Sequence, residues 1–175
     1  MRTVDSTVSS LDDMELMGNG KAYRETLCGI IERLPLLANF SRSEVKLLAN
    51  YMVPYRASVG TMIFQEGMRD RFMAFVSSGR LKVYKEGDPG EQHKLATVRP
   101  GMSIGEMSLL DSQPHSATVV ATETTELLVL SSKKLQQLEN KFPHLAYKML
   151  WIISLMLSNR LRKTSGVLVD YLGEQ

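Results

Sequence analysis

Six short runs of alternating apolar and polar residues, separated by turn residues, constrain this chain more than any other feature of its sequence. They occupy residues 61–64, 72–77, 81–85, 94–98, 117–121 and 126–130, and Ser78-Gly79 is one of the turn signals between them. No long helical segment separates these runs. We therefore predict antiparallel strands that form a sandwich or barrel rather than a parallel α/β sheet.

Segments with a helical period lie before these runs. Residues 21–33 are expected to be helical, and Ser41-Arg42-Ser43-Glu44 forms a capping box that begins a second helix. The predicted apolar positions are Leu27, Ile30, Ile31 and Leu34 in the first helix and Val45, Leu48 and Ala49 in the second. Residues 1–20 are polar and aperiodic, so we expect a flexible arm there.

A helical period returns after residue 130. A short helix is expected over 133–140, and Pro143 suits the first turn of a long helix that continues to about residue 172. Two apolar stripes run along the long helix: one stripe is Leu150, Ile153, Leu157, Leu161 and Leu168, and the other is Ala146, Met149, Ile152 and Met156. One stripe can cover the barrel, and we predict that the first forms a homodimer interface; the alternative is a single broad face buried within one subunit.

Composition excludes several classes of protein. A single cysteine, Cys28, cannot form an internal disulfide and suits a reducing cytoplasm. The N-terminus lacks the apolar region of a signal peptide, and no run is long and apolar enough for a membrane helix. The net charge of +2 is too small to indicate a nucleic-acid partner by itself.

Residues 100–119 carry the chemistry. Gly101 and Gly105 bend the chain, and Glu106 begins a helical turn whose free backbone N–H groups form an anion-binding end. The Glu106 carboxylate could accept a hydrogen bond from a sugar hydroxyl. Ser116 offers a hydroxyl and an amide where the next strand begins.

This segment resembles the phosphate-binding cassette of cyclic-nucleotide-binding domains, found in bacterial catabolite activators and in protein kinase A regulatory subunits. The matching residues are Gly105-Glu106-Met107-Ser108-Leu109-Leu110 and Pro114-His115-Ser116-Ala117-Thr118-Val119. The resemblance extends over about 30–166 and implies a mainly β, α+β fold: an antiparallel jelly-roll barrel with N-terminal helices and a long C-terminal helix. The implied divisions are 1–20, 21–142 and 143–175.

The resemblance implies a ligand site for a cyclic nucleotide. Gly105, Glu106, Met107 and Ser108 would meet the ribose and phosphate, with Glu106 accepting from the 2′-hydroxyl. His115 and Ser116 would meet the phosphate, and Ala117 is a further predicted ligand-binding residue. No catalytic residue, metal or cofactor is implied, and cyclic AMP is expected ahead of cyclic GMP as the regulatory ligand.

His115 departs from the family pattern, which has an arginine at this position. Arginine gives a permanent, forked contact to phosphate, whereas histidine gives one or two donors and titrates near neutral pH. Loss of a charged hydrogen bond costs about 1.5–3 kcal/mol, or one to two decades of affinity. If the imidazolium contacts the phosphate, affinity is expected to be greatest near pH 6.

The long helix carries a second resemblance. Thr164-Ser165 looks like the segment of the catabolite activators that offers hydroxyl groups to the adenine base, one from each subunit. Arg160 lies one turn earlier on a similar face and could replace some of the missing charge. We expect the ligand to lie between the cassette and this helix.

The sequence gives less support to three other functions: a hydrolase, a metal site and direct DNA binding. Gly101-Met-Ser103-Ile-Gly105 matches a hydrolase nucleophile motif, but that motif needs a parallel α/β sheet. His93, His115 and His144 stand too far apart in sequence to form a metal-binding motif. The related transcription factors carry a DNA-binding domain after the long helix, and this chain ends at Gln175, so direct DNA binding is not expected.

We therefore expect a non-catalytic regulatory domain that senses a cyclic nucleotide and signals through its long helix to a downstream protein partner. The alternatives are a ligand-blind domain of the same fold that acts in protein–protein interaction, and a receptor for a cyclic dinucleotide.

Overall fold

A computed structural model describes residues 10–18, 21–87 and 91–173 of the 175-residue chain. The chain divides into two compact units, Met1–Leu135 and Gln136–Gln175. Within the described residues the elements are, in chain order, the 3-10 helix η1 Ser10–Asp13, β1 Glu15–Leu16, α1 Lys21–Glu32, the 3-10 helix η2 Pro35–Leu37, α2 Arg42–Leu48, β2 Val53–Ala57, β3 Met62–Phe64, β4 Phe72–Ser78, β5 Leu81–Glu86, β6 Gln92–Val98, β7 Ser103–Ile104, α3 Glu106–Asp111, β8 Thr118–Ala121, β9 Thr125–Ser131, α4 Ser132–Lys141 and α5 Pro143–Gly173.

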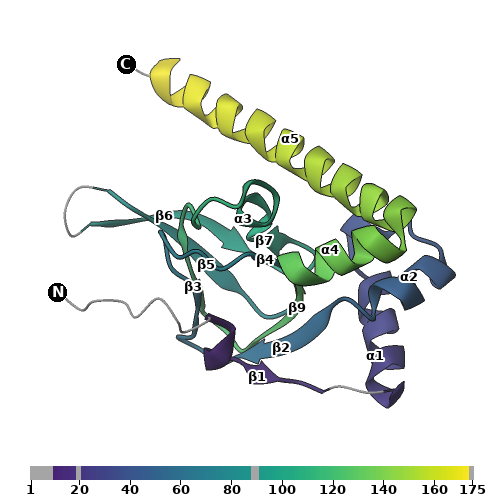
Figure 1. Cartoon of the computed structure of the whole chain (residues 1–175). Coiled ribbons are helices and arrows are strands. Elements are labelled where there is room, and N and C mark those ends of the chain that lie inside the picture. Colours follow the sequence, from purple (N-terminus) through teal and green to yellow (C-terminus); the bar gives the residue numbers. More distant parts are fainter. Residues whose placement is uncertain (1–9, 19–20, 88–90, 174–175) are drawn as a thin grey trace. The chain divides into compact units, whose positions relative to one another are not determined.

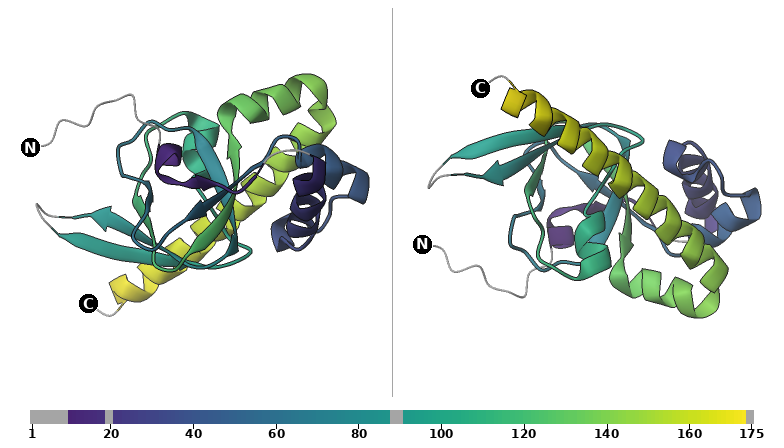
Figure 2. Two further views of the ribbon diagram at one scale, coloured as in Figure 1. Left: turned by 90° about the horizontal axis from the view of Figure 1, so that it is seen from below. Right: turned by 90° about the horizontal axis from the view of Figure 1, so that it is seen from above.

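The described strands of the first unit form two antiparallel sheets (Figure 1). One sheet has the order β1-β2-β9-β4-β7 and the other has the order β3-β8-β5-β6. These two sheets and the flanking helices confirm the predicted α+β jelly-roll fold. Figure 2 shows strands β5 and β6 extending away from α1 and α2.

The core lies between the inward faces of the two sheets. Strand β4 is buried on both faces from Phe72 to Val76, which explains its continuous apolar run. In β5 and β8 the inward residues alternate with outward ones, and Leu81, Val119 and Ala121 belong to the same buried cluster. Transfer of such apolar side chains out of water drives folding of this unit.

The N-terminal helices form as their sequences predict. In α1, Leu27 and Ile31 are buried one helical turn apart. Helix α2 begins with the complete capping box: the Ser41 hydroxyl accepts from the Glu44 amide at 3.3 Å, and the Glu44 carboxylate accepts from the Ser41 amide at 2.7 Å. Its apolar face of Val45, Leu48 and Ala49 is buried.

The expected flexible arm over residues 1–20 is wrong for the part that the structure describes. β1 pairs with β2 in the register Glu15–Arg56 and Leu16–Tyr55, and Met14 joins the buried core cluster. Burial of Met14 and two ladder pairs order this segment although it has no periodic pattern. Residues 1–9 and 19–20 lie outside the described residues.

The second unit contains most of α4 and all of α5. The Ser131 hydroxyl accepts from the Lys134 amide at 3.3 Å at the start of α4, and Pro143 occupies the first position of α5. Along α5, Ala146, Met149 and Ile153 are buried, whereas Leu161 and Leu168 are exposed. None of the helices in the described part of the chain is both long and apolar enough to cross a membrane.

Candidate functional site

Residues 100–119 form a strand, a short helix and a second strand. β7 pairs with β4 in the register Ala74–Ile104 and Phe75–Ser103, which places the following Gly105 at the edge of the larger sheet. Gly105 has φ +77°, and a Cβ atom at this position would overlap the backbone carbonyl of Phe72. The turn into α3 therefore requires glycine at residue 105.

Helix α3 buries two polar side chains in its first turn. Glu106 and Ser108 are each only 2% exposed, and the Ser108 hydroxyl donates to the Gly105 carbonyl at 3.0 Å. Met107, between them, is exposed. Glutamate is rarely buried this deeply in a folded protein, so Glu106 is a candidate functional group.

Ser116 lies beside the exposed side of α3. Its hydroxyl contacts the Met107 sulfur at 3.9 Å, and its side chain is exposed. The next residue, Ala117, is buried where β8 begins. The structure therefore brings together Gly105, Glu106, Met107, Ser108, Ser116 and Ala117, which the sequence predicts as cassette residues.

The backbone of His115 is held by the loop that follows β3. The His115 amide donates to the Met68 carbonyl at 2.8 Å, and the Gly67 amide donates to the His115 carbonyl at 2.9 Å. These two bonds fix the residue immediately before Ser116. The loop after β3 thus positions the start of β8.

The imidazole of His115 points into an aromatic cluster. It is 4% exposed, stacks on Phe64 at a centroid distance of 3.8 Å, and meets the edge of Phe72 at 5.8 Å. Among the residues that the structure describes, none forms a hydrogen bond with its Nε2 atom. The side chain is therefore packed as part of the core in this structure.

Burial lowers the pKa of His115 below the usual value for histidine. The nearby Asp70 carboxylate and a hydrogen bond to the Asp70 backbone oppose this shift but do not cancel it. The structure therefore favours a neutral imidazole. The expected increase in affinity near pH 6 applies only if the imidazolium contacts the phosphate.

A cluster that sequence reasoning missed lies next to Ser116. Lys85 forms an ion pair with Glu66, and its Nζ atom also donates to the Ser116 carbonyl at 2.8 Å. The hydrogen bond from Lys85 lowers the pKa of Glu66. These residues come from β5, from the loop after β3 and from the segment just before β8, so no local sequence motif signals the cluster.

The predicted base-binding residues lie on α5, in the second unit. The Thr164 hydroxyl donates to the Arg160 carbonyl at 3.0 Å, within the helix, and Ser165 follows it. Both side chains are exposed. Their role in ligand binding stays a prediction.

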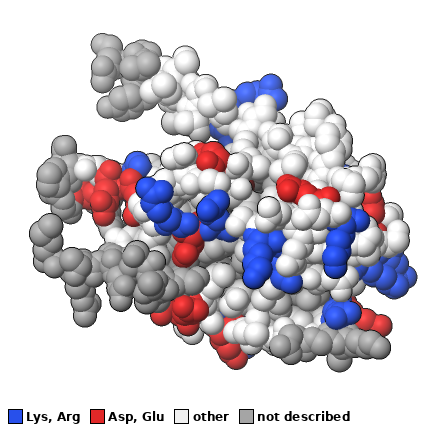
Figure 3. Space-filling model, in the orientation of Figure 1, with Lys and Arg blue, Asp and Glu red and all other residues white. Residues whose placement is uncertain are grey.

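The rival chemical readings find no support in the geometry. Ser103 is completely buried in β7 and is paired with β4 in an antiparallel sheet, which is not the setting of a hydrolase nucleophile. Within residues 10–18, 21–87 and 91–173, no three His, Cys, Asp or Glu side chains gather as a metal site would require. Lys and Arg on the face in Figure 3 are spread in separate groups, with acidic side chains between them.

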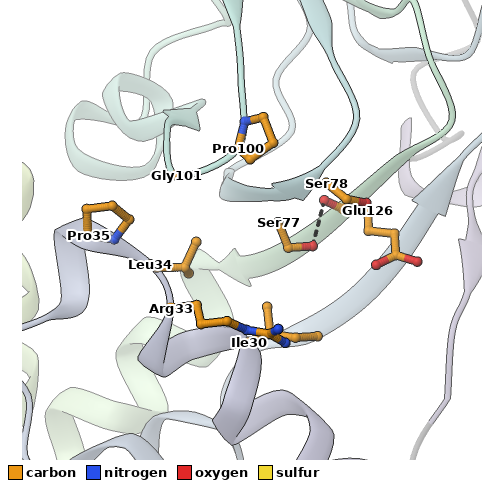
Figure 4. A pocket seen from close by; sticks show the side chains of 9 residues that line it. All are labelled: Ile30, Arg33, Leu34, Pro35, Ser77, Ser78, Pro100, Gly101 and Glu126. Atoms are coloured by element: carbon orange, nitrogen blue, oxygen red, sulfur yellow. Dashed lines mark hydrogen bonds between the residues drawn. The ribbon is translucent and has the colours of Figure 1, made fainter.

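A pocket of about 440 Å³ lies elsewhere on the first unit (Figure 4). It is lined by Ile30, Arg33, Leu34, Pro35, Ser77, Ser78, Pro100, Gly101 and Glu126. The Ser77 hydroxyl donates to the Glu126 carbonyl at 3.1 Å, and the Arg33 Nε atom donates to the Gly29 carbonyl at 2.9 Å. Pro100 and Gly101 at the start of the cassette line it, but the predicted ligand residues Glu106, His115 and Ser116 do not.

A jelly-roll barrel that carries a strand–short helix–strand cassette defines a class of ligand-sensing regulatory domains. Comparison with known proteins agrees with this class, because the family model described as "Cyclic nucleotide-binding domain" matches residues 56–142. The chain belongs to the cyclic nucleotide-binding domain family.

Two curated relatives and one solved structure show the range of similarity. The chain is 33% identical to the cyclic AMP receptor protein of Thermus thermophilus, over 74% of this chain and 58% of that protein. It is 29% identical to the cAMP-dependent protein kinase regulatory subunit of Yarrowia lipolytica, over 63% of this chain and 28% of that protein. It therefore spans only part of the length of these relatives.

The solved structure is a cyclic nucleotide-binding domain from Methylobacillus flagellatus. It has a TM-score of 0.81 and 28% identity, and the match covers 97% of both chains. The similarity therefore extends over nearly the whole chain, the long C-terminal helix included.

Proposed function

We propose that this chain is a regulatory module that binds a cyclic nucleotide at the cassette and signals through α5. The observation that carries the proposal is the placement of Glu106. This carboxylate is buried at the first turn of α3, next to exposed Met107 and within a cassette that ends at Ser116. A carboxylate in that position suits the 2′-hydroxyl of a ribose, which is a strong hydrogen-bond donor to an ionised acceptor.

The remaining contacts are assigned by the same reasoning. The phosphate is placed at the amide and hydroxyl of Ser116 and the amide of Ala117, where β8 begins. The resemblance assigns the base to Thr164 and Ser165 of α5. Cyclic AMP is proposed ahead of cyclic GMP, since both curated relatives described above are named for cyclic AMP.

We further propose that α5 pairs with α5 of a second copy of the chain. Leu161 and Leu168, which the sequence places on the interface stripe, are 68% and 56% exposed. Ile153, from the same stripe, is already buried within the single chain at 1% exposure. The C-terminal half of the stripe, which contains Leu161 and Leu168, is therefore the part available to a partner helix.

A titration of purified protein with cyclic AMP, cyclic GMP and a cyclic dinucleotide tests the ligand. A ligand at 100 times its dissociation constant should raise the free energy of unfolding by about 2.7 kcal/mol, which a thermal-shift measurement detects. Calorimetry should then give a saturable isotherm for cyclic AMP. Absence of binding by every one of these ligands would contradict the proposal.

The second candidate is a ligand-blind interaction module of the same fold. The observation that favours it is the buried imidazole of His115, which stacks on Phe64, has a pKa lowered by burial and occupies the position of the family's arginine. Such a domain would act through α5 alone. It should dimerise normally and should bind none of the three nucleotides.

A further inference from the structure

Lys85 lies on the inward side of the smaller sheet. In β5 the side chains alternate, so Leu81, Val83 and Lys85 share one face. Leu81 is fully buried and Val83 packs against the core, whereas the Lys85 side chain is 45% exposed. On this face of β5, two apolar side chains are therefore followed by the Lys85 ammonium group, which water and a ligand can reach.

Three segments converge on this ammonium group. Its Nζ atom donates to the Ser116 carbonyl at 2.8 Å and to the Glu66 carboxylate. The Glu66 carboxylate also accepts from the Glu86 amide at 3.1 Å, and the Glu66 amide donates to the Thr118 hydroxyl at 3.0 Å. Lys85 is thus held at the start of β8, next to the residues assigned to the phosphate.

The cassette needs a cation from some source other than residue 115. The His115 ring is packed against Phe64 in the core, and burial lowers its pKa, which disfavours a charged ring at this position. Arg71 also reaches the cassette, but its Nη1 atom contacts the Ser112 hydroxyl at 3.1 Å, four residues before Ser116. Lys85 contacts Ser116 itself.

We propose that Lys85 supplies the positive charge that selects a phosphate-bearing ligand at Ser116 and Ala117. This inference rests on the proposed function of the cassette. The Glu66 carboxylate shares this charge in the unliganded protein, so an incoming phosphate competes with Glu66 for the ammonium group.

The test separates charge from structure with two variants of residue 85. Lys85→Gln keeps an N–H donor for the Ser116 carbonyl and loses the charge, and Lys85→Met loses both. Each variant should bind cyclic AMP about tenfold more weakly than wild type by calorimetry. Each should bind adenosine, which carries no phosphate, within twofold of wild type.

Two further variants serve as controls. Lys82→Met removes a charge from the outward face of the same strand and should change neither affinity by more than twofold. Glu66→Gln releases Lys85 and should tighten cyclic AMP binding. Raising the salt concentration should weaken cyclic AMP binding by wild type more than by Lys85→Gln.

The possible results are distinct. If wild type binds cyclic AMP and Lys85→Gln binds it equally well, Lys85 is not the phosphate cation. An equal loss of affinity for cyclic AMP and adenosine in both variants would assign Lys85 a purely structural role, which also overturns the inference. A wild-type protein that binds neither ligand removes the proposed function and this inference with it.

Discussion

The imidazole of His115 lies flat on the ring of Phe64, with centroids 3.8 Å apart and planes inclined by 6°. Phe72 meets the same imidazole edge-on, at 66°. Aromatic contacts of this kind stabilise a buried ring beyond its area alone. They hold the side chain of residue 115 in the core, while its backbone forms part of the cassette.

The first prediction concerns stability against pH. The pKa of His115 is lowered in the folded chain, and the Asp70 carboxylate is the charged group that faces it. As pH falls below about 6.5, the unfolded chain takes up a proton before the folded chain does, so stability decreases. The loss should be at most about 1.4 kcal/mol per pH unit, and it should stop below the folded-state pKa.

Urea unfolding of wild type and His115→Phe between pH 7.5 and 5.5 measures this loss. The variant should lack the part of the pH dependence that His115 contributes. His93→Phe alters an exposed histidine and should behave as wild type. Parallel stability curves for wild type and His115→Phe would show that His115 does not titrate as its burial implies.

The second prediction concerns residue 115 and ligand affinity. His115→Arg restores the family's forked cation and should tighten cyclic AMP binding by about one to two decades at pH 8. Wild-type affinity should change little between pH 8 and pH 6, because burial lowers the pKa of His115 and its ring packs on Phe64. Calorimetry at both pH values measures each quantity. If wild type binds more tightly at pH 6 and His115→Phe abolishes the gain, His115 contacts the phosphate as an imidazolium.

The third prediction concerns Glu106. Glu106→Ala should weaken cyclic AMP binding more than tenfold, because the acceptor for the ribose hydroxyl is lost. Glu106→Gln keeps a carbonyl acceptor of similar size and should lose less. Unchanged calorimetric affinity in folded Glu106→Ala protein would contradict the assigned orientation of the ligand.

The fourth prediction concerns the turn before α3. Gly105→Ala places a side chain at φ +77° against the Phe72 carbonyl and should lower the free energy of unfolding by about 1–3 kcal/mol. Gly29→Ala is the matched control, since a Cβ atom there meets nothing within 4 Å and the residue lies inside α1. It should raise stability by up to about 1 kcal/mol. Denaturant unfolding that ranks the two variants the other way would refute the argument from this turn.

The fifth prediction concerns assembly. Replacing Leu161 and Leu168 with Glu would place like charges on both helices of the proposed pair, so the variant should be a folded monomer. Both residues are exposed in the single chain, so the barrel should be unaffected. Light scattering should show wild type as a dimer. A wild-type monomer at high concentration would rule out the pairing.

Local chemistry allowed much of the fold to be predicted from the sequence. The capping box at Ser41 depends on residues three apart, and the six alternating runs became strands β3, β4, β5, β6, β8 and β9. The sequence did not reveal β1, β2 or β7. Pro54 within β2 weakens the strand pattern, and the two-residue strands are defined only by their partners in the sheet.

The sequence by itself determined the local pattern of Gly105, Glu106 and Ser116, which lie within twelve residues of each other and whose resemblance to a family motif predicts one cassette. Only the tertiary structure decided what surrounds residue 115. Phe64, Phe72 and Lys85 come from three strands far away in sequence, and they meet the cassette because the sheets bury their inward faces together. Burial lowers the pKa of His115, and contacts with Glu66 and Ser116 position the Lys85 amine. Both effects depend on packing between segments that are distant in sequence rather than on any local run of residues.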